Sequence, residues 1–308
     1  MVLLFWIAVF IVSLIVLLKS SDYFTDTAEK IGIHFGIPAF IVGVTIVSIG
    51  TSMPELASSV IAAFGGAPEF VVGNVLGSNI TNILLILGVI AVVGKKMKLT
   101  WELIRVDLPL LMGSAILVFF MLSDGIFSFT EAIICILGYL IYVAYVTSIH
   151  RKPSKKRRKL LGWKTPLILV LSCIGIYIGA RFTVESVLQI ADILMVSTGI
   201  IAASIVALGT SLPELSVSLT AAKKGKAELA IGNILGSNIL NSFLVLGASG
   251  AIATLVVPAA LLVFILPFFL GVTLLYFFIT QDNRITRWEG WMLILIYIFF
   301  LIKIFGII

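Results

Sequence analysis

Residues 50–56 read Gly-Thr-Ser-Met-Pro-Glu-Leu, and residues 209–215 read Gly-Thr-Ser-Leu-Pro-Glu-Leu. Both stretches lie inside long apolar runs, and the match between them continues without a gap over residues 43–88 and 202–247, an offset of 159 residues. Residues 73–82, Gly-Asn-Val-Leu-Gly-Ser-Asn-Ile-Thr-Asn, likewise match residues 232–241, Gly-Asn-Ile-Leu-Gly-Ser-Asn-Ile-Leu-Asn. The chain therefore carries an internal repeat, and its densest polar content lies in the middle of hydrophobic sequence.

The composition indicates a membrane protein with many spans. Of the 308 residues, 60% are hydrophobic and 12% are charged, and the mean hydropathy is +1.21, whereas about 25% of the residues of a soluble domain are charged. The net charge of +6 comes from basic residues between the apolar runs, so it does not suggest a nucleic-acid partner. We expect a multi-pass protein of the cell membrane, with the lipid bilayer around it and no obligatory protein partner.

Hydrophobic segments give the number of spans. A spanning helix needs about 20 mostly apolar residues, and ten segments qualify. These segments are 1–20, 37–64, 69–94, 106–123, 128–149, 165–181, 196–222, 228–254, 256–280 and 288–307. Each half holds five, an odd number, so two homologous halves must insert with opposite orientation.

These spans predict an all-α membrane protein of ten transmembrane helices, arranged as two inverted five-helix repeats. The first repeat covers 1–149 and the second 165–308, with a basic loop at 150–164 between them. Helices two and seven should be broken, because each contains glycine and a proline, which removes a backbone donor.

Basic residues predict the orientation. Residues 151–159 are mostly lysine and arginine, and such loops stay in the cytoplasm. Placing loop 150–164 inside puts the N-terminus outside and leaves only Arg181 and Lys303 among the outer basic residues. The same run could also bind anionic lipid.

Two carboxylates stand out by their depth. Only Glu55 and Glu214, of fifteen acidic residues, have long apolar runs on both sides. A charged side chain at that depth costs at least about 2.5–3.5 kcal/mol on insertion scales, and no lysine or arginine lies at comparable depth to neutralise either one. A bound cation is the simplest counter-charge.

The residues around these glutamates favour a hard cation. Pro54 and Pro213 should break the helix near Thr51 and Thr210, which would free carbonyls such as those of Ser48 and Ala207. Carboxylate, carbonyl and hydroxyl oxygens suit calcium, which takes about 6–8 of them. Histidine and cysteine are absent from both motifs, which argues against zinc or copper.

Each polar motif also has a purely structural interpretation. Ser52 with Glu55, and Ser211 with Glu214, fit the capping-box pattern of a helix start. In the second motif, asparagine and serine recur at spacing four and so share one helix face. They could ligate an ion or link helices by hydrogen bonds, and both roles stay open for Asn74 and Asn233. Asn79 and Asn238 point away from this face and are expected to be structural.

These motifs closely resemble the two alpha-repeats of the sodium/calcium exchangers, within the cation/calcium antiporter superfamily. The short loops and the chain length resemble the archaeal and bacterial members. The resemblance covers both repeats and the ten-segment layout. Proton/calcium members carry Glu soon after the second Gly-Asn, whereas Leu76 and Leu235 stand in that neighbourhood here, so the chain resembles the sodium branch.

The resemblance implies a set of ion ligands. Calcium would bind the carboxylates of Glu55 and Glu214 and the backbone oxygens of Thr51 and Thr210. Sodium would use these groups together with Ser52, Ser211, Ser78 and Ser237, and with the carbonyls of Ser48 and Ala207. Asn82 and Asn241 would line the centre, where many relatives carry aspartate and potassium-dependent members typically do. This departure argues against a requirement for potassium.

The sequence therefore predicts an antiporter that exchanges sodium for calcium by alternating access at a single midplane site. Calcium and sodium are its transported ions, and no organic cofactor is expected. A proton-coupled or magnesium-type exchanger on the same fold stays open, and so does a cation channel. The sequence shows no nucleophile, base and acid arranged for catalysis, so an enzyme is not expected.

Overall fold

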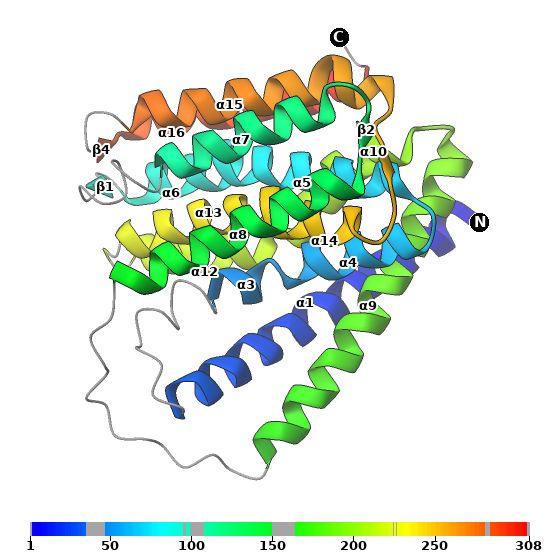
Figure 1. The fold of residues 1–308 in the computed structure, drawn as a ribbon, viewed down its shortest axis with the longest axis horizontal. Coiled ribbons are helices and arrows are strands. Elements are labelled where there is room, and N and C mark those ends of the chain that lie inside the picture. Colours follow the sequence, from blue (N-terminus) through cyan, green and yellow to red (C-terminus); the bar gives the residue numbers. More distant parts are fainter. Residues whose placement is uncertain are drawn as a thin grey trace.

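The computed structural model describes residues 2–34, 47–94, 97–98, 108–149, 164–223, 225, 227–280 and 284–306. Within these ranges the chain is almost entirely helical, with four two-residue strands (Figure 1). The first part of the predicted second span, 37–46, and the basic run at 151–159 lie outside the described residues.

The first half begins with the longest helix of the described chain, α1, which continues to His34 instead of ending near residue 20. The helices of this half are α1 (Val2–His34), α3 (Val47–Thr51), α4 (Met53–Phe64), α5 (Pro68–Thr81), η2 (Asn82–Ile86), α6 (Leu87–Gly94), α7 (Leu108–Leu122) and α8 (Phe129–Ile149). Helices α4 and α5 each carry a proline in the first turn, where the missing N–H breaks no helical hydrogen bond.

The second half repeats this order. Its helices are α9 (Lys164–Leu194), α10 (Thr198–Ile201), η4 (Ala202–Val206), α11 (Ala207–Thr210), α12 (Leu212–Lys223), α13 (Ala227–Leu240), η5 (Asn241–Val245), α14 (Leu246–Gly250), η6 (Leu261–Ile265), α15 (Leu266–Ile279) and α16 (Arg287–Ile304). The π-helices η2 and η5 begin at Asn82 and Asn241, which are equivalent in the repeat. π-Helical turns occur frequently at functional sites.

Several helices are suited to a membrane. Within the described residues, six are long and apolar enough to cross one, and the count becomes seven when a bent pair is taken as one span. That pair, Thr198–Thr210 and Leu212–Lys223, bends by 42° at Ser211, close to the predicted break in helix seven. The shorter apolar helices α4 and α7 fall below this length. The chain is therefore a multi-pass helical membrane protein, and the number ten stays a prediction.

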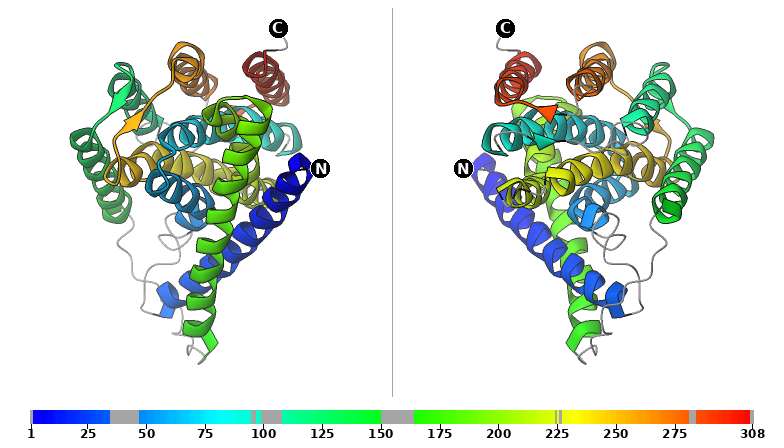
Figure 2. Two further views of the ribbon diagram at one scale, coloured as in Figure 1. Left: turned by 90° about the vertical axis from the view of Figure 1, so that its right-hand side faces the viewer. Right: turned by 90° about the vertical axis from the view of Figure 1, so that its left-hand side faces the viewer.

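The repeated polar segments form the centre of the molecule. The most apolar windows of Pro68–Gly94 and Leu229–Gly250 are 83% and 78% buried, whereas those of Val2–Phe24 and Phe129–Ser148 are 17% and 22% buried. The exposed faces of the outer helices are rich in leucine, isoleucine and phenylalanine, as a surface in contact with lipid requires. Figure 2 shows α1 and α9 crossing along one side of the bundle.

One close contact between the halves depends on glycine. A Cβ placed on Gly77 of α5 would lie 2.3 Å from the carbonyl oxygen of Ala203 in η4, and one on Gly73 would lie 2.2 Å from that of Gly199. Small residues of this kind let helix backbones approach closely. The first-half helix α5 therefore packs directly on the N-terminal part of predicted span seven.

Two strand pairs also join the halves. Strand β1 (Met97–Lys98) pairs antiparallel with β4 (Arg284–Ile285), and β2 (Ile126–Phe127) pairs antiparallel with β3 (Leu255–Val256). Met97 faces Ile285, and Ile126 faces Val256. Adding the repeat offset of 159 residues to Met97 gives Val256, and adding it to Ile126 gives Ile285. The repeat offset therefore relates the β1–β4 pair to the β2–β3 pair.

Candidate cation site

The two Gly-Thr-Ser-x-Pro-Glu motifs meet in the buried centre. Glu55 lies in the first turn of α4 and Glu214 in the first turn of α12, and the exposed fraction of each is 0%. Each glutamate follows a non-helical residue, Ser52 or Ser211, that separates two helical pieces. All twelve predicted ligands are buried: Ser48, Thr51, Ser52, Glu55, Ser78, Asn82, Ala207, Thr210, Ser211, Glu214, Ser237 and Asn241.

The serines cross from one repeat to the other. Ser52 Oγ donates to Glu214 Oε1 at 2.8 Å, and Ser211 Oγ donates to Glu55 Oε1 at 3.3 Å. Ser52 stands at the N-cap of α4 but makes no side-chain cap hydrogen bond. The capping interpretation therefore does not describe Ser52. Its hydroxyl stabilises the carboxylate of the opposite repeat instead.

The second motif brings further oxygens to the same region. Ser237 Oγ of α13 donates to Glu214 Oε1 at 3.3 Å, whereas its equivalent Ser78 has no hydrogen-bond partner among the described residues. Asn82 donates through Nδ2 to Asn238 Oδ1 at 2.9 Å. Asn241 has neither amide atom paired within the described chain. The repeats thus supply the same residue types in different hydrogen-bonding states.

Several buried oxygen atoms lack a partner, and these define the candidate site. Among the described residues the oxygens without a hydrogen bond include Glu55 Oε2, Glu214 Oε2, Ser48 Oγ, Ser78 Oγ, Asn82 Oδ1 and Asn241 Oδ1. A buried polar group without a partner is costly, and a buried charge more so. These atoms fit a hard cation, because such ions prefer carboxylate, amide and hydroxyl oxygens.

The backbone at the motifs differs from the expectation in one respect. The Ser48 carbonyl accepts from Ser52 N, and the Ala207 carbonyl accepts from Ser211 N, both at 3.1 Å. The expectation that a helix break frees these two carbonyls is therefore wrong here. The reason is geometric: proline removes the donor for the carbonyl four residues earlier, which belongs to Gly50 or Gly209. Roles for Ser48 and Ala207 in binding sodium stay predictions.

The threonine hydroxyls are engaged within the protein. Thr51 Oγ1 donates to the Ser48 carbonyl at 3.3 Å and to Asn233 Oδ1 at 3.4 Å. Thr210 Oγ1 donates to the Val206 carbonyl at 3.1 Å. The bonds to backbone carbonyls hold both threonine side chains against their own helical segments, and the bond to Asn233 also links Thr51 to α13. The predicted ligands at both positions are backbone oxygens, which the hydroxyls do not block.

Asn74 and Asn233 link neighbouring helices. Asn74 Nδ2 donates to Ser59 Oγ at 3.0 Å, and Asn233 Nδ2 donates to Ser218 Oγ at 3.1 Å. The first bond joins α4 to α5, and the second joins α12 to α13. The Asn233 amide is bonded at both ends, which favours the linking role for it, whereas Asn74 Oδ1 has no partner among the described residues, so both roles stay open for Asn74.

The sequence missed the residue that contacts Asn82. Asn238 was expected to be structural, because it lies off the face shared by Ser237 and Asn241. Residue spacing carries no signal for this contact, because neighbouring residues of an α-helix point about 100° apart and Asn238 therefore faces away from Ser237.

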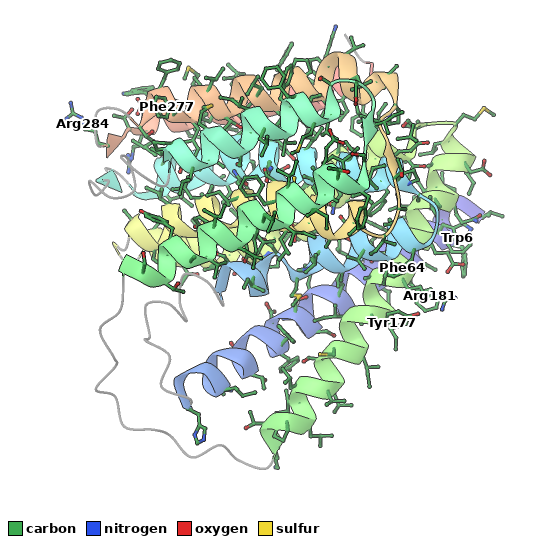
Figure 3. All side chains as sticks on the ribbon, viewed as in Figure 1. Trp6, Phe64, Tyr177, Arg181, Phe277 and Arg284 are labelled. Carbon is green, nitrogen blue, oxygen red and sulfur yellow. The ribbon has the colours of Figure 1, made fainter. Side chains whose placement is uncertain are left out.

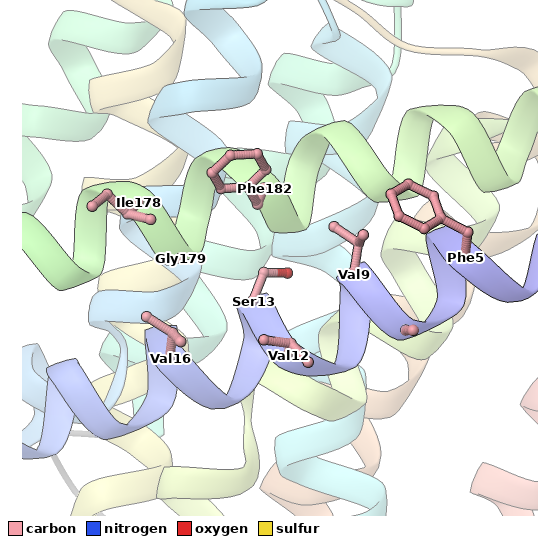
Figure 4. Close-up of a pocket in the computed structure, with 9 residues that line it drawn as sticks. Phe5, Val9, Val12, Ser13, Val16, Ile178, Gly179 and Phe182 are labelled. Carbon is pink, nitrogen blue, oxygen red and sulfur yellow. The ribbon is translucent and has the colours of Figure 1, made fainter.

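A separate apolar cavity of about 350 Å³ lies between α1 and α9 (Figure 4). Phe5, Val12 and Phe182 are among its lining residues, and Ser13 is the polar one. The Ser13 hydroxyl is engaged with the Phe10 carbonyl and with Thr183. No carboxylate lines this cavity, so it does not compete with the glutamate region as a cation site.

Comparisons with known proteins agree on one family. The model of the sodium/calcium exchanger protein family matches residues 5–148 and 164–306. Sodium/calcium exchanger MaX1 of Methanosarcina acetivorans is 36% identical, over 97% of this chain and 98% of the relative. The uncharacterized membrane protein MJ0091 of Methanocaldococcus jannaschii is 30% identical, over 94% of each chain.

Solved structures give the same result. The sodium-calcium exchanger NCX_Mj, soaked with 2.5 mM Na⁺ and 10 mM Sr²⁺, aligns with a TM-score of 0.70 and 29% identity, over 96% of this chain and 98% of that one. NCX_Mj soaked with zero Na⁺ and Ca²⁺ aligns with a TM-score of 0.67. The buried carboxylates, the fold and both kinds of comparison therefore lead to one conclusion: this chain belongs to the sodium/calcium exchanger family, whose members are membrane transporters and not enzymes.

Proposed function

We propose that this chain exchanges sodium for calcium across the cell membrane by alternating access at a single site between α4, α5, α12 and α13. The observation that carries the proposal is the crosswise pairing of Ser52 with Glu214 and of Ser211 with Glu55. It brings two buried carboxylates from opposite repeats to one region, and each keeps one oxygen free of partners within the described chain.

The architecture proposed for this mechanism is the pair of inverted repeats, 1–149 and 165–308. The crosswise serines and the two exchanged strand pairs support it, because a pseudo-two-fold axis between the halves would generate both. Figure 1 places the start of α1 and the end of α16 at the same side, as an even number of spans requires. The 42° bend at Ser211 supports a broken helix seven.

The ligand sets proposed for the two ions overlap. Calcium would bind Glu55 and Glu214 with the backbone oxygens of Thr51 and Thr210. Sodium would occupy these groups and the neighbouring neutral oxygens, which are those of Ser48, Ser52, Ser78, Ala207, Ser211 and Ser237, around a centre lined by Asn82 and Asn241. Because both ions neutralise the same glutamates, their binding is competitive. Competition at one site couples the two fluxes.

The charge of the site predicts a voltage-dependent exchange. With Asn82 and Asn241 neutral, two ionised glutamates give the site a charge of −2. One calcium ion brings this charge to zero, and three sodium ions bring it to +1. A cycle with these ions moves one net charge, so the membrane potential should bias it. Neither asparagine supplies the extra charge that a bound potassium ion would need.

Calcium uptake into sodium-loaded proteoliposomes tests the function. Uptake should depend on the outward sodium gradient, should speed up at an inside-positive potential and should not need potassium on either side. The potential would be set by an ionophore pair free of potassium. Uptake driven by a proton gradient alone, or single-channel currents, would contradict sodium-coupled exchange.

The proposed orientation places the N-terminus outside and loop 150–164 in the cytoplasm. In Figure 3, Arg181 and Arg284 lie at opposite ends of the molecule, which supports opposite membrane sides for them. Single cysteines replacing Ser154 and Asp124 in a cysteine-free chain should react with impermeant reagents from opposite sides. Labelling of both from one side would contradict this topology.

A further inference from the structure

The two central asparagines do not have the same surroundings. Asn82 and Asn238 are 1% and 0% exposed, and Asn82 Nδ2 donates to Asn238 Oδ1 at 2.9 Å. This bond uses the amide nitrogen of Asn82. The amide oxygen of Asn82 has no partner among the described residues.

The equivalent bond is not formed on the other side. The repeat offset relates Asn82 to Asn241 and Asn238 to Asn79, but Asn79 Nδ2 donates to Ser242 Oγ at 2.9 Å. Both amide atoms of Asn241 are unpaired within the described chain.

The two sides also differ in one neighbouring residue. Ser242 corresponds to Ile83 in the first repeat, and an isoleucine side chain cannot accept a hydrogen bond. Asn79 Nδ2 therefore has an acceptor next to Asn241, whereas Asn238 Nδ2 has no hydrogen bond within the described chain and Asn238 takes part only as the acceptor from Asn82.

We propose that Asn238 is a positioning residue of the cation site, which fixes the Asn82 amide so that its oxygen, and not its NH₂ group, is available to the ion. Asn241 has no equivalent bond within the described chain, although Asn79 Oδ1 is unpaired there. This inference rests on the proposed function, since it assigns a role within the same ion site.

The bond matters because an asparagine amide has two chemically opposite ends. The oxygen attracts a cation, and the NH₂ group repels it. The electrostatic energy of this contact is proportional to the charge of the ion, so a loosely held Asn82 should weaken calcium binding more than sodium binding. The expected phenotype is a change in selectivity between the two ions.

Calcium binding to the purified full chain, measured by isothermal titration calorimetry, tests this role, with sodium affinity measured by competition. Asn238→Leu removes the acceptor at similar side-chain volume and should weaken calcium binding about tenfold, the loss expected for one hydrogen bond. Sodium affinity should fall by about threefold, because the ion carries half the charge. The matched control, Asn79→Leu, should change calcium affinity by less than about twofold, because its partner is Ser242.

A double-mutant cycle separates positioning from general loss of structure. In an Asn82→Ala background, Asn238→Leu should have no further effect on calcium affinity, because the group that it positions is gone. Asn238→Asp keeps an acceptor oxygen and should bind calcium at least as tightly as the unmodified chain, which keeps the test valid if the leucine variant does not fold.

The inference is overturned by calcium and sodium affinities that fall equally in Asn238→Leu, by additive effects in the cycle, or by an Asn238→Asp variant as weak as Asn82→Ala. The proposed function fails separately, if the unmodified chain takes up no calcium in exchange for sodium. A chain that transports normally and loses affinity with Asn82→Ala, but not with Asn238→Leu, contradicts this inference alone.

Discussion

The two halves of the cation site have the same residues except that Ala207 stands where the first half has Ser48, and their hydrogen bonds differ. Glu214 Oε1 accepts from two hydroxyls, those of Ser52 at 2.8 Å and Ser237 at 3.3 Å. Glu55 Oε1 accepts from Ser211 at 3.3 Å, and the Ser78 hydroxyl has no partner within the described chain. The Glu214 half is therefore more tightly held than the Glu55 half.

This difference shows that sequence symmetry does not impose local symmetry. Two inverted repeats can exchange their arrangements when a transporter changes the side to which its site opens. Under the inverted-repeat architecture proposed above, the unequal halves are one of two related arrangements, and the two repeats exchange their hydrogen bonds between these arrangements. Variants at equivalent positions test how far the two halves differ in function.

The largest effects should come from the glutamates, where we expect the halves to be equal. Glu55→Gln or Glu214→Gln should lower calcium exchange by roughly 100-fold or more, because removing one partner from a buried charge set costs about 3–5 kcal/mol. Sodium-driven calcium uptake into proteoliposomes measures this loss. The exposed Glu185 of α9 gives the control, and Glu185→Gln should transport normally. Near-normal uptake by Glu55→Gln or by Glu214→Gln would show that the substituted glutamate is not part of the cation site.

The depth of Glu55 and Glu214 made these residues predictable from sequence. The apolar runs around the two glutamates can be read directly from the sequence, and so can the repeat that relates Glu55 to Glu214. The destination of the Ser52 hydroxyl was not predictable, since the same Ser-x-x-Glu spacing fits a local cap. Only the packing of α3 against α12 across the two repeats decides that Ser52 reaches Glu214.

Asn238 shows a second limit of sequence reasoning. A regular α-helix places residues four apart on one slowly turning face, which excluded Asn238 from the face of Ser237. The structure has π-helices beginning at Asn82 and Asn241, and each shifts the helical phase. That shift acts on the residues that follow Asn82 and Asn241, so the contact between Asn82 and Asn238 comes instead from the packing of the two repeats, which residue spacing does not encode. The long extension of α1 to His34 was missed because its charged end is not apolar enough to score as a span.

The next largest effect concerns helix packing next to the two halves. Gly77→Ala places a methyl group 2.3 Å from the backbone oxygen of Ala203, whereas Gly236→Ala meets the side-chain oxygen of Ser48 at 2.6 Å. A backbone cannot move aside as a hydroxyl can. Gly77→Ala should lower the free energy of unfolding by about 1–3 kcal/mol, the range for overpacking, and Gly236→Ala by less.

Thermal unfolding of the two purified glycine variants, followed by tryptophan fluorescence, measures this difference. The expected order is a clearly lower Tm for Gly77→Ala and a Tm close to that of the unmodified chain for Gly236→Ala. Equal shifts would show that the two helix contacts are equivalent, and the comparison between the halves would then not extend to their packing.

Smaller effects should follow from the crosswise serines. Ser52→Ala removes the 2.8 Å bond to Glu214, and Ser211→Ala removes the 3.3 Å bond to Glu55. Shorter hydrogen bonds to an ionised group are the stronger ones. We expect the KM for calcium to rise about tenfold in Ser52→Ala and about threefold in Ser211→Ala. The reverse order would mean that the Glu55 half is the tighter one during transport.

The smallest expected effect separates the two ions at the second motif. Ser237→Ala removes a donor to Glu214 at 3.3 Å, so the carboxylate that both ions share is less stabilised, and the KM for calcium should rise by about twofold to threefold. Ser78 donates to neither glutamate in the described chain, and its proposed role is as a sodium ligand alone. Ser78→Ala should therefore leave the KM for calcium unchanged while the sodium concentration for half-maximal exchange rises.

Initial rates of calcium uptake at several internal sodium concentrations give both values from one set of vesicles. If the KM for calcium rises as much in Ser78→Ala as in Ser237→Ala, both hydroxyls reach a glutamate during the transport cycle. The two halves would then exchange their hydrogen-bonding arrangements more rapidly than calcium binds, and the calcium KM would not distinguish them.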